Sequence, residues 1–400
     1  MQATLSKSGP FDDSKRKMSI NTNIISVCAL VPYPVDTTPS QRYRIEQWAP
    51  YLKPQGINVE LVPFVDDRLM TLLHKPGRRA AKALGNARRF AHRFKDVMIT
   101  RRYDAVVIHR AACIAGPAIL ERLVAWLGLP IIYDFDDAIF RLHTTEANRG
   151  FGWLKFPGKT ATICRISKHV VVGNAWLADY ARQFNPHVTI IPTSVDTDHY
   201  RPEKKHGSNG RVIVGWTGSS TSQTHLEMFA PLLRELTARR DVELRVISDR
   251  EPALPGVSYV WRPWSAETEV DELSYFDIGI MPMPDDEWSR GKCAAKALQY
   301  MGMGIPTVCS AVGANCEVIQ HGQNGLLAVT SSEWMANLES LVDDPALRAR
   351  LGMMGRRTVE EGYSMRRCAD LFARVVRQAI GEEKRDESGV ERPVVGVNPR

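Results

Sequence analysis

The chain has 400 residues, 44% of them hydrophobic, and a formal net charge of +7 at pH 7. This length exceeds the size at which one hydrophobic core usually stops growing, and the composition is ordinary for a globular protein, so we expect two domains. No apolar run approaches the roughly eighteen residues that span a bilayer, and the N-terminus has no apolar core typical of a signal peptide. The sequence predicts a cytoplasmic protein, and peripheral attachment to the inner face of the membrane stays open.

The seven cysteines are scattered through the chain. None forms a C-x-x-C pair, and none has the spacing of metal ligands. We interpret them as reduced thiols, most of them in the core, and expect neither a structural metal nor a disulfide framework.

Short β-branched runs alternate with helix-length amphipathic segments through the first half of the chain. Such alternation is typical of βαβ units around a parallel sheet. Helices are predicted near residues 42–53, 116–128 and 175–184. The runs predicted to be strands are 24–31, 58–64, 104–109, 129–135, 169–174 and 188–192.

A strongly basic stretch lies between the second and third of these runs. Residues 74–102 contain ten Lys and Arg and one Asp. A solvated helix face would explain this composition, and so would a surface that meets anionic lipid headgroups or an acidic acceptor, so both interpretations stay open. Basic and aromatic residues do not interleave regularly, and we therefore expect no nucleic acid partner.

The periodic pattern breaks after Pro192 in a stretch rich in Pro, Ser, Asp, Gly and Lys. We interpret residues 196–210 as a linker between two Rossmann-like domains, an N-terminal one at 21–195 and a C-terminal one at 211–380. The predicted fold class is α/β, with two doubly wound parallel-sheet domains that face each other across a cleft.

The second alternating series begins after this linker. A helix is predicted near residues 222–239, and further helices run to about residue 380. Residues 1–20 and 381–400 are predicted to be disordered because they lack apolar periodicity. The predicted strands of this half are 211–218, 242–248, 257–261, 276–284 and 305–310.

The turn after the first strand of the second series is rich in Gly and Ser. Gly218, Ser219 and Ser220 would let backbone amides and hydroxyls approach a phosphate at a helix N-terminus. Ligands of open α/β sheets bind beyond the carboxyl ends of the strands, which is where this turn lies. The turn matches neither a Walker loop nor G-x-G-x-x-G, and a plain capped turn would have the same composition.

A later turn, "SRGKCAAKALQYMGMGIPTV" at residues 289–308, combines positive charge with a predicted helix. Lys292, Lys296 and Gln299 fall at i, i+4 and i+7, which predicts a single helix face with Gly291 at its N-terminus. Two ammonium groups beside the positive end of a helix suit an anionic ligand. From charge alone, a solvated helix edge is the alternative.

Residues 289–327 and 170–202 carry motifs of a known family. The first segment resembles the donor-site segment of GT-B glycosyltransferases of family 4, where a Glu-x7-Glu loop and helix leads into G-x-P-V-V and E-x-I-x-x-G-x-N-G-x-L. The second is similar to that family's crossing between domains, and the resemblance covers residues 24–380. The positions in register are Gly304, Pro306, Val308, Gly313, Glu317, Gly322, Asn324 and Gly325.

The sequence departs from the family at the donor site. Gly291 and Gln299 replace both acidic residues of Glu-x7-Glu, and the Gly-Ser turn lacks the Arg and Lys that neutralise the diphosphate in the family. We therefore expect Lys292, with Lys296 or Arg290, to supply positive charge to the donor phosphates. Gln299 is expected to hydrogen-bond the ribose hydroxyls.

The resemblance implies two further donor-side positions. Residues 259–264 would form a base-recognition loop in which Arg262 and Trp264 follow a strand edge, with a core position for the Trp as the alternative. Glu317 would lie near the donor, although capping of the next helix is a competing role.

The first half is then expected to bind the acceptor. Arg42 and Arg44 lie where the family has an acceptor-side loop and would bind an anionic acceptor group, with surface salt bridges as the alternative. His109 and Arg110 end a predicted strand, where related enzymes place a His that touches the donor sugar. We assign His109 a catalytic role and Arg110 an acceptor-binding role.

Three carboxylates follow the next strand, Asp134, Asp136 and Asp137. Clustered carboxylates need partners or a cation. GT-A glycosyltransferases hold a divalent metal on such a D-x-D, which gives a competing hypothesis, but two successive Rossmann-like series speak against it. We expect Asp136 or Asp137 to orient the acceptor or accept its proton, with no bound metal.

The predicted reaction is transfer of a sugar from a nucleotide diphosphate sugar to a hydroxyl of a glycan, a lipid-linked molecule or a small acceptor. The resemblance implies retention of anomeric configuration, no metal and no cofactor beyond the donor itself. A sugar-nucleotide epimerase on the same fold and a weakened donor-site pseudoenzyme that acts as a binding subunit remain the alternatives.

Overall fold

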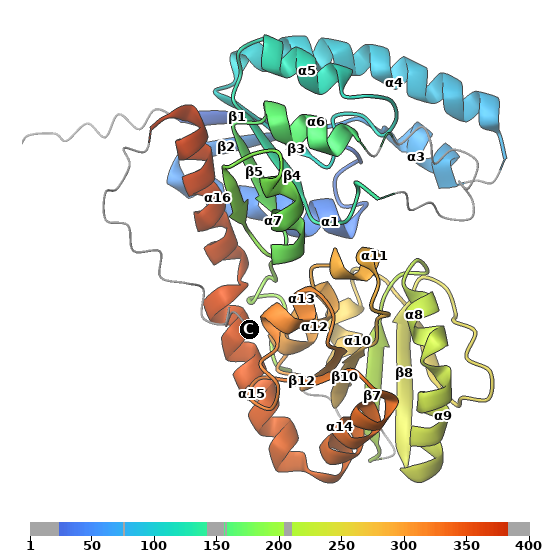
Figure 1. Ribbon diagram of the computed structural model, residues 1–400. Helices are drawn as coiled ribbons and strands as arrows, with labels where there is room; N and C mark the ends of the chain where they lie inside the picture. Colours follow the sequence, from blue (N-terminus) through green and yellow to red (C-terminus); the bar gives the residue numbers. More distant parts are fainter. Residues whose placement is uncertain (1–23, 75–76, 142–155, 157, 204–209, 383–400) are drawn as a thin grey trace, which may run out of the picture.

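Two parallel β-sheets organise the chain (Figure 1). The computed structural model describes residues 24–74, 77–141, 156, 158–203 and 210–382. Each sheet has six strands with helices on both faces, and the two sheets lie in separate halves of the molecule. The predicted α/β fold with two doubly wound sheets is confirmed.

The first sheet has the strand order β2-β1-β3-β4-β5-β6. The order reverses between β1 and β3, and such a switch point is where ligands bind in open α/β sheets. These strands read as continuous apolar runs because helices cover both faces of the sheet. Their bounds are β1 (Ile25–Val31), β2 (Ile57–Pro63), β3 (Ala105–His109), β4 (Ile131–Phe135), β5 (His169–Val172) and β6 (Val188–Ile190).

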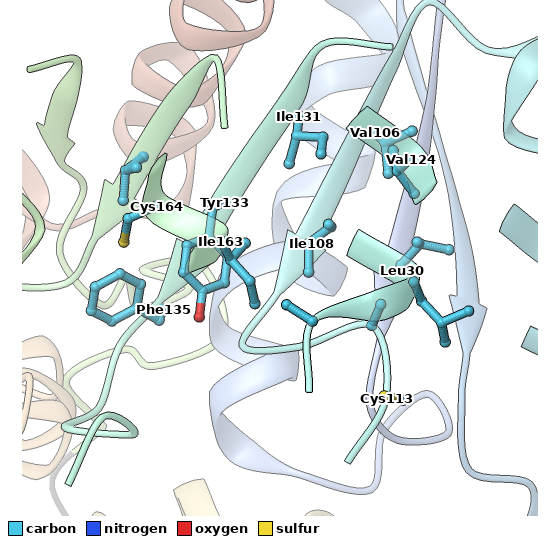
Figure 2. Packing of buried hydrophobic residues seen from close by; sticks show 14 of the residues in the cluster. Leu30, Val106, Ile108, Cys113, Val124, Ile131, Tyr133, Phe135, Ile163 and Cys164 are labelled. Carbon is cyan, nitrogen blue, oxygen red and sulfur yellow. The ribbon is translucent and has the colours of Figure 1, made fainter. Parts of the chain in front are cut away.

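One face of this sheet packs against α5 and α6. Ile108 and Tyr133 from the strands meet Val124 and Ile163 from these helices, and all four side chains are buried (Figure 2). This packing holds β3 and β4 in place against the two helices. The helical segments of this half are α1 (Pro39–Gln41), the π-helical turn η1 (Arg42–Glu46), α2 (Gln47–Leu52), the 3-10 turns η2 (Lys53–Gln55) and η3 (Thr100–Arg102), α3 (Asp67–His74), α4 (Arg79–Ile99), α5 (Ile119–Trp126), α6 (Lys159–Ile166) and α7 (Ala175–Arg182).

The second sheet has the order β12-β11-β10-β7-β8-β9, with its switch point between β7 and β10. This is the strand order of a dinucleotide-binding Rossmann sheet. The strands are β7 (Val212–Thr217), β8 (Val242–Ser248), β9 (Val260–Pro263), β10 (Ile278–Met281), β11 (Thr307–Ser310) and β12 (Leu326–Ala328).

The helix predicted near 222–239 is two helices. Pro231 lies in the first turn of the second one and has no amide hydrogen, so the first helix cannot continue through it. The helices of this half are α8 (Gln223–Met228), α9 (Ala230–Arg239), α10 (Glu269–Leu273), α11 (Glu287–Arg290), α12 (Ala295–Gly302), α13 (Ala314–Val318), α14 (Ser331–Asp343), α15 (Pro345–Gly362) and α16 (Met365–Ile380).

The last helix, α16, returns to the first sheet (Figure 1). Phe372 packs against Trp48 of α2, with ring centroids 5.3 Å apart, and both side chains are buried. The sequence grouped this helix with the C-terminal domain, and the predicted domain boundaries stay a prediction. Residues 1–20, nearly all of 381–400 and residues 204–209 of the predicted linker lie outside the described part of the chain.

The cysteines lie mostly inside the protein, and none of them is bonded to another. All seven cysteines are free thiols, and six of them are buried. Over the residues that the structure describes, no helix is both long enough and apolar enough to cross a membrane.

Candidate functional site

Charged side chains gather where β1, β3 and β4 of the first sheet end, opposite the segment that joins β10 to α12. The innermost group is Arg44, whose Nε and Nη2 donate to Asp134 at distances from 2.5 to 3.0 Å. Its Nη1 donates to the Ile191 carbonyl at 2.7 Å. Arg44 is fully buried, so the prediction that it binds an acceptor is wrong. Its guanidinium instead neutralises the buried carboxylate of Asp134.

Asp134 also holds His109. Its Oδ2 lies 2.6 Å from His109 Nδ1, and both side chains are buried. Burial alone would raise the pKa of Asp134, but Arg44 and His109 outweigh it and hold this pKa below its usual range. Asp134 is therefore ionised and fixes the orientation of the imidazole.

Ser40 connects this buried pair to the next carboxylate. Its Oγ lies 3.0 Å from His109 Nε2 and donates to Asp136 Oδ1 at 2.7 Å. Ser40 is half-buried, whereas His109 is fully buried. Ser40 lies in α1, and a single hydroxyl in the segment after β1 forms no motif, so it was not predicted. Because β1 pairs with β3, which ends at His109, the segment after β1 was the available signal.

Arg110 pairs with both carboxylates that follow β4, of which Asp136 is partly buried and Asp137 is buried. Its Nε and Nη2 donate to Asp136 Oδ1 at 2.9 and 2.8 Å, and Nη2 lies 3.4 Å from Asp137 Oδ2. Burial raises the pKa of Asp136, but Arg110 and its neighbours hold that pKa far below the usual range. Arg110 has a φ of 58°, a left-handed conformation that costs a non-glycine residue about 1–2 kcal/mol. Such strain is typical of functional loops.

The segment from Arg290 to Cys293 belongs to the second half of the chain and contacts the first half. Asn174 Nδ2 donates to the carbonyls of Arg290 and Lys292 at 3.1 and 2.9 Å. A Cβ on Gly291 would lie 2.8 Å from the Cβ of Ala138, so only glycine permits this approach. The chain turns at Ala294, with a φ of 52°, before the helix begins.

The single helix face predicted for Lys292, Lys296 and Gln299 is therefore wrong. Helix α12 begins at Ala295, and Lys292 lies in the segment before it, residues 290–293, not on the helix. Gly291 does not open this helix; its role is to bring the two halves close together. Lys292 Nζ instead lies 3.1 Å from Asp137 Oδ2 and 4.5 Å from the Trp288 ring centroid.

Lys296 is the cation that lies beside the Gly-Ser turn. Its Nζ is 5.5 Å from the Trp216 ring, and a Cβ added to Gly218 would lie 2.7 Å from its Cε. No carboxylate of the described residues pairs with it. Burial and then the charge of Lys292 lower the pKa of Lys296 to about 8.

Two of the amides expected at this turn already have partners. The Gly218 amide donates to the Ile247 carbonyl at 3.0 Å, and the Ser220 amide donates to Asp249 Oδ1 at 2.6 Å. The hydroxyl of Ser219 bonds to that of Thr221 at 2.7 Å. The positive charge at this turn therefore comes from Lys296, and the turn lies at the switch point between β7 and β10.

Gln299 lies in a buried polar network between the two halves. Its Nε2 is within 3.2 Å of the hydroxyls of Tyr43 and Tyr200 and 3.1 Å from Glu269 Oε1. Arg42 Nη2 donates to the Tyr43 hydroxyl at 3.1 Å, so this arginine closes the same network. The predicted ribose contact of Gln299 and the acceptor contact of Arg42 remain predictions.

The other predicted donor-side residues are spread more widely. Glu317 accepts from the Ala175 amide at 3.1 Å and so caps α7 of the opposite half, not the helix that follows it. Burial raises the pKa of Glu317. Arg290 pairs with Asp285 at 2.7 Å on the surface, and Arg262 is half-exposed, 3.8 Å from Glu272. The site as described therefore centres on Lys296, Lys292 and the Asp-Arg-His group.

Two six-stranded Rossmann-like sheets with charged loops facing each other define the GT-B class. Solved structures agree on this fold. Sucrose-phosphate synthase from Thermosynechococcus elongatus superposes with a TM-score of 0.65 at 14% identity, covering 90% of this chain and all of that one. HepE of Anabaena in complex with UDP and glucose gives a TM-score of 0.61 at 13% identity, covering 88% of this chain and all of that one.

Sequence comparison gives the activity class. Residues 211–344 match the family model described as "Glycosyl transferases group 1". The MMP alpha-(1->4)-mannosyltransferase of Mycolicibacterium hassiacum is 26% identical over 327 residues, which cover 73% of this chain and 75% of that protein. The chain is a GT-B glycosyltransferase, and the GT-A fold of the competing D-x-D hypothesis is excluded.

Proposed function

We propose that this glycosyltransferase moves a sugar from a nucleotide diphosphate sugar to a hydroxyl acceptor, with retention of configuration and without a metal. The observation that carries the proposal is Lys296, a cation beside the turn after β7 that pairs with no carboxylate in the part of the chain that the structure describes. An anionic diphosphate at this turn would supply the missing partner and stabilise the ammonium form. The relatives support a nucleotide donor, since one is a mannosyltransferase and HepE was solved with UDP and glucose.

Three carboxylates support the metal-free part of the proposal; Asp134 lies within β4, not on the turn as predicted, and Asp136 and Asp137 follow the strand. Asp134 faces Arg44, Asp136 faces Arg110, and Asp137 faces Lys292. Each carboxylate is already neutralised by a side chain, so the cluster has no need of a divalent cation. Lys296 would stabilise the leaving diphosphate. Lys292 would do the same once its ammonium group moves away from Asp137.

The function is tested by nucleotide release. Full-length protein is incubated with UDP-glucose, GDP-mannose and ADP-glucose, each with soluble glycan and lipid-linked acceptors, and the anomeric configuration of any product is read by NMR. We expect release that depends on an acceptor, and a product with the configuration of the donor. Conversion of the donor sugar without an acceptor would identify an epimerase, and binding without turnover would identify a pseudoenzyme.

Chelation tests the absence of a metal. Because each carboxylate has a cationic partner, EDTA is expected to leave the rate of transfer unchanged within about twofold, a difference in barrier of less than about 0.5 kcal/mol. The same assay with added Mg²⁺ or Mn²⁺ serves as the control. A loss of activity on chelation that a divalent cation restores would contradict the metal-free proposal.

We also propose that α4 attaches the enzyme to anionic membranes. The helix lies on the outer side of the first half, away from the second sheet (Figure 1). Leu84, Arg88, Lys95 and Ile99 are exposed and share one face of this helix. Apolar side chains among cations are typical of helices that lie in a bilayer interface.

Part of the basic charge in residues 74–102 is not available to lipid. Arg93 is buried and donates to the carbonyls of Val31 and Val62, so it ties α4 to the sheet. Arg89 donates to the carbonyl of Pro63 at 3.0 Å. The surface that would meet lipid is therefore narrower than the sequence indicated, and each remaining cation would contribute about 1 kcal/mol.

Vesicle flotation checks this attachment. The protein is expected to float with anionic vesicles at low salt and to detach at about 0.5 M salt, because the screening length falls to a few ångströms. Arg88→Glu with Lys95→Glu should abolish flotation. The control, Arg367→Glu with Arg374→Glu, makes the same charge change on exposed positions of α16 and should not. Equal behaviour of the two double variants would contradict a specific role of α4.

A further inference from the structure

One half-buried hydroxyl connects the buried His109 to the surface of the site. Ser40 Oγ lies 3.0 Å from His109 Nε2 and 2.7 Å from Asp136 Oδ1. On the far side of the ring, Nδ1 lies 2.6 Å from Asp134 Oδ2. Because His109 and Asp134 are fully buried, Ser40 is the group through which they can act on a ligand.

The hydroxyl of Ser40 can form its hydrogen bonds to His109 and Asp136 in two ways. An ionised Asp134 only accepts, so Nδ1 carries a hydrogen and Nε2 is the nitrogen that gains or loses one. Ser40 has a single hydroxyl hydrogen. With a neutral imidazole, Ser40 donates to Nε2. With an imidazolium, Nε2 donates to Oγ and Ser40 donates to Asp136. His109 Nε2 and Asp136 Oδ1 both lie within hydrogen-bond distance of Ser40 Oγ. The hydroxyl can therefore change from one state to the other by a single rotation when His109 gains or loses its proton.

We propose that Ser40 and His109 relay the proton of the acceptor hydroxyl during sugar transfer, an inference that rests on the proposed function. The acceptor O–H bond breaks and its proton goes to Ser40 Oγ, while the proton of Ser40 moves to His109 Nε2. The acceptor oxygen forms its bond to C1 of the sugar as the bond from C1 to the phosphate oxygen breaks. That electron pair leaves with the nucleoside diphosphate, and His109 later returns the proton to water through Ser40.

The surrounding charges suit this role. Asp134 and Asp136 flank the imidazolium state, and Arg44 and Arg110 hold these two carboxylates in place. Arg110 and its neighbours keep the pKa of Asp136 far below the usual range, so this carboxylate is a poor proton acceptor. Asp136 therefore accepts a hydrogen bond from the hydroxyl of Ser40 and does not itself take the proton of the acceptor. The connectivity Ser-His-Asp is that of hydrolase triads, where the His takes the hydroxyl proton in the same way.

Kinetics of four variants and one control variant test the relay. Ser40→Ala and His109→Gln are each expected to lower kcat by about 100-fold, the low end for loss of acid–base catalysis, while the affinity for the nucleoside diphosphate stays unchanged. The double variant should be no slower than either single variant, because both act in one step. Ser40→Thr keeps the hydroxyl and should recover most of the rate. Thr37→Ala removes a nearby hydroxyl that donates to the Pro34 carbonyl and should leave kcat unchanged.

Two readouts separate the relay from a merely structural effect. The wild type should show a solvent deuterium isotope effect on kcat that Ser40→Ala removes, and the ring nitrogen signals of His109 should shift in Ser40→Ala while those of other histidines stay. Ser40→Ala that keeps kcat within about threefold of the wild type, or single losses that multiply in the double variant, would overturn the relay. A wild type that uses none of the donors would instead overturn the proposed function itself.

Discussion

Replacing Arg44 with Met is expected to lower the free energy of unfolding by about 3–5 kcal/mol, the cost of leaving one charge of a buried pair uncompensated. Asp134 would keep only His109 as a partner at a fully buried position, and the Ile191 carbonyl would lose its donor. Denaturant unfolding, followed by circular dichroism and Trp fluorescence, measures the loss.

A second variant distinguishes the charge from the packing. Arg44→Met combined with Asp134→Leu removes both charges, and we expect it to recover part of the lost stability, because buried pairs exchanged for apolar residues are often neutral. Arg42→Met is the matched control, since this neighbouring arginine lies 3.9 Å from Glu269 in a partly exposed position. A single Arg44→Met variant as stable as the wild type would show that Asp134 is not ionised in the folded protein.

Replacing Lys296 with Met is expected to weaken binding of a nucleoside diphosphate by about 10- to 100-fold and to leave binding of the nucleoside unchanged. A hydrogen bond to a charged group contributes about 1.5–3 kcal/mol, and the nucleoside has no phosphate to form one. Calorimetry with UDP, GDP and ADP, each beside its nucleoside, makes the measurement. Lys95→Met, an exposed lysine of α4, is the control.

The same site should respond to pH. The pKa of Lys296 is about 8 without a ligand, and the anion binds the ammonium form. Affinity for the diphosphate should therefore be full below this pKa and fall as the pH rises through it. Lys296→Met should remove this dependence. Lys292→Met should weaken binding less, because Lys292 must first leave Asp137. Equal losses of diphosphate and nucleoside affinity would contradict a phosphate role.

The fold was predictable because its strands are buried on both faces. β1 and β3 read as continuous apolar runs, and the helices between them have clear amphipathic periods. The rule that ligands bind beyond the carboxyl ends of strands also brought His109, Arg110 and Asp136 into one group of candidates, and these side chains do lie together, while their roles stay predictions.

The errors have a common physical cause. A sequence shows that Arg44 follows β1, but it does not show that the side chain turns inward to a carboxylate from β4. The break before α12 depends on contacts of Gly291 and Cys293 with the opposite half, which no local period encodes. Ser40 was missed for the same reason, since its two partners come from β3 and the turn after β4.

The chain crosses between its two halves twice, and the crossings touch. The Val195 amide donates to the Tyr363 carbonyl at 2.9 Å, and the Met365 amide donates to the Val195 carbonyl at 3.2 Å. Domain closure turns on a few residues in loops or at the ends of elements, and both connections lie in such positions. The two connections are therefore tied to each other by backbone hydrogen bonds, so any movement of one half relative to the other has to bend both connections at the same place.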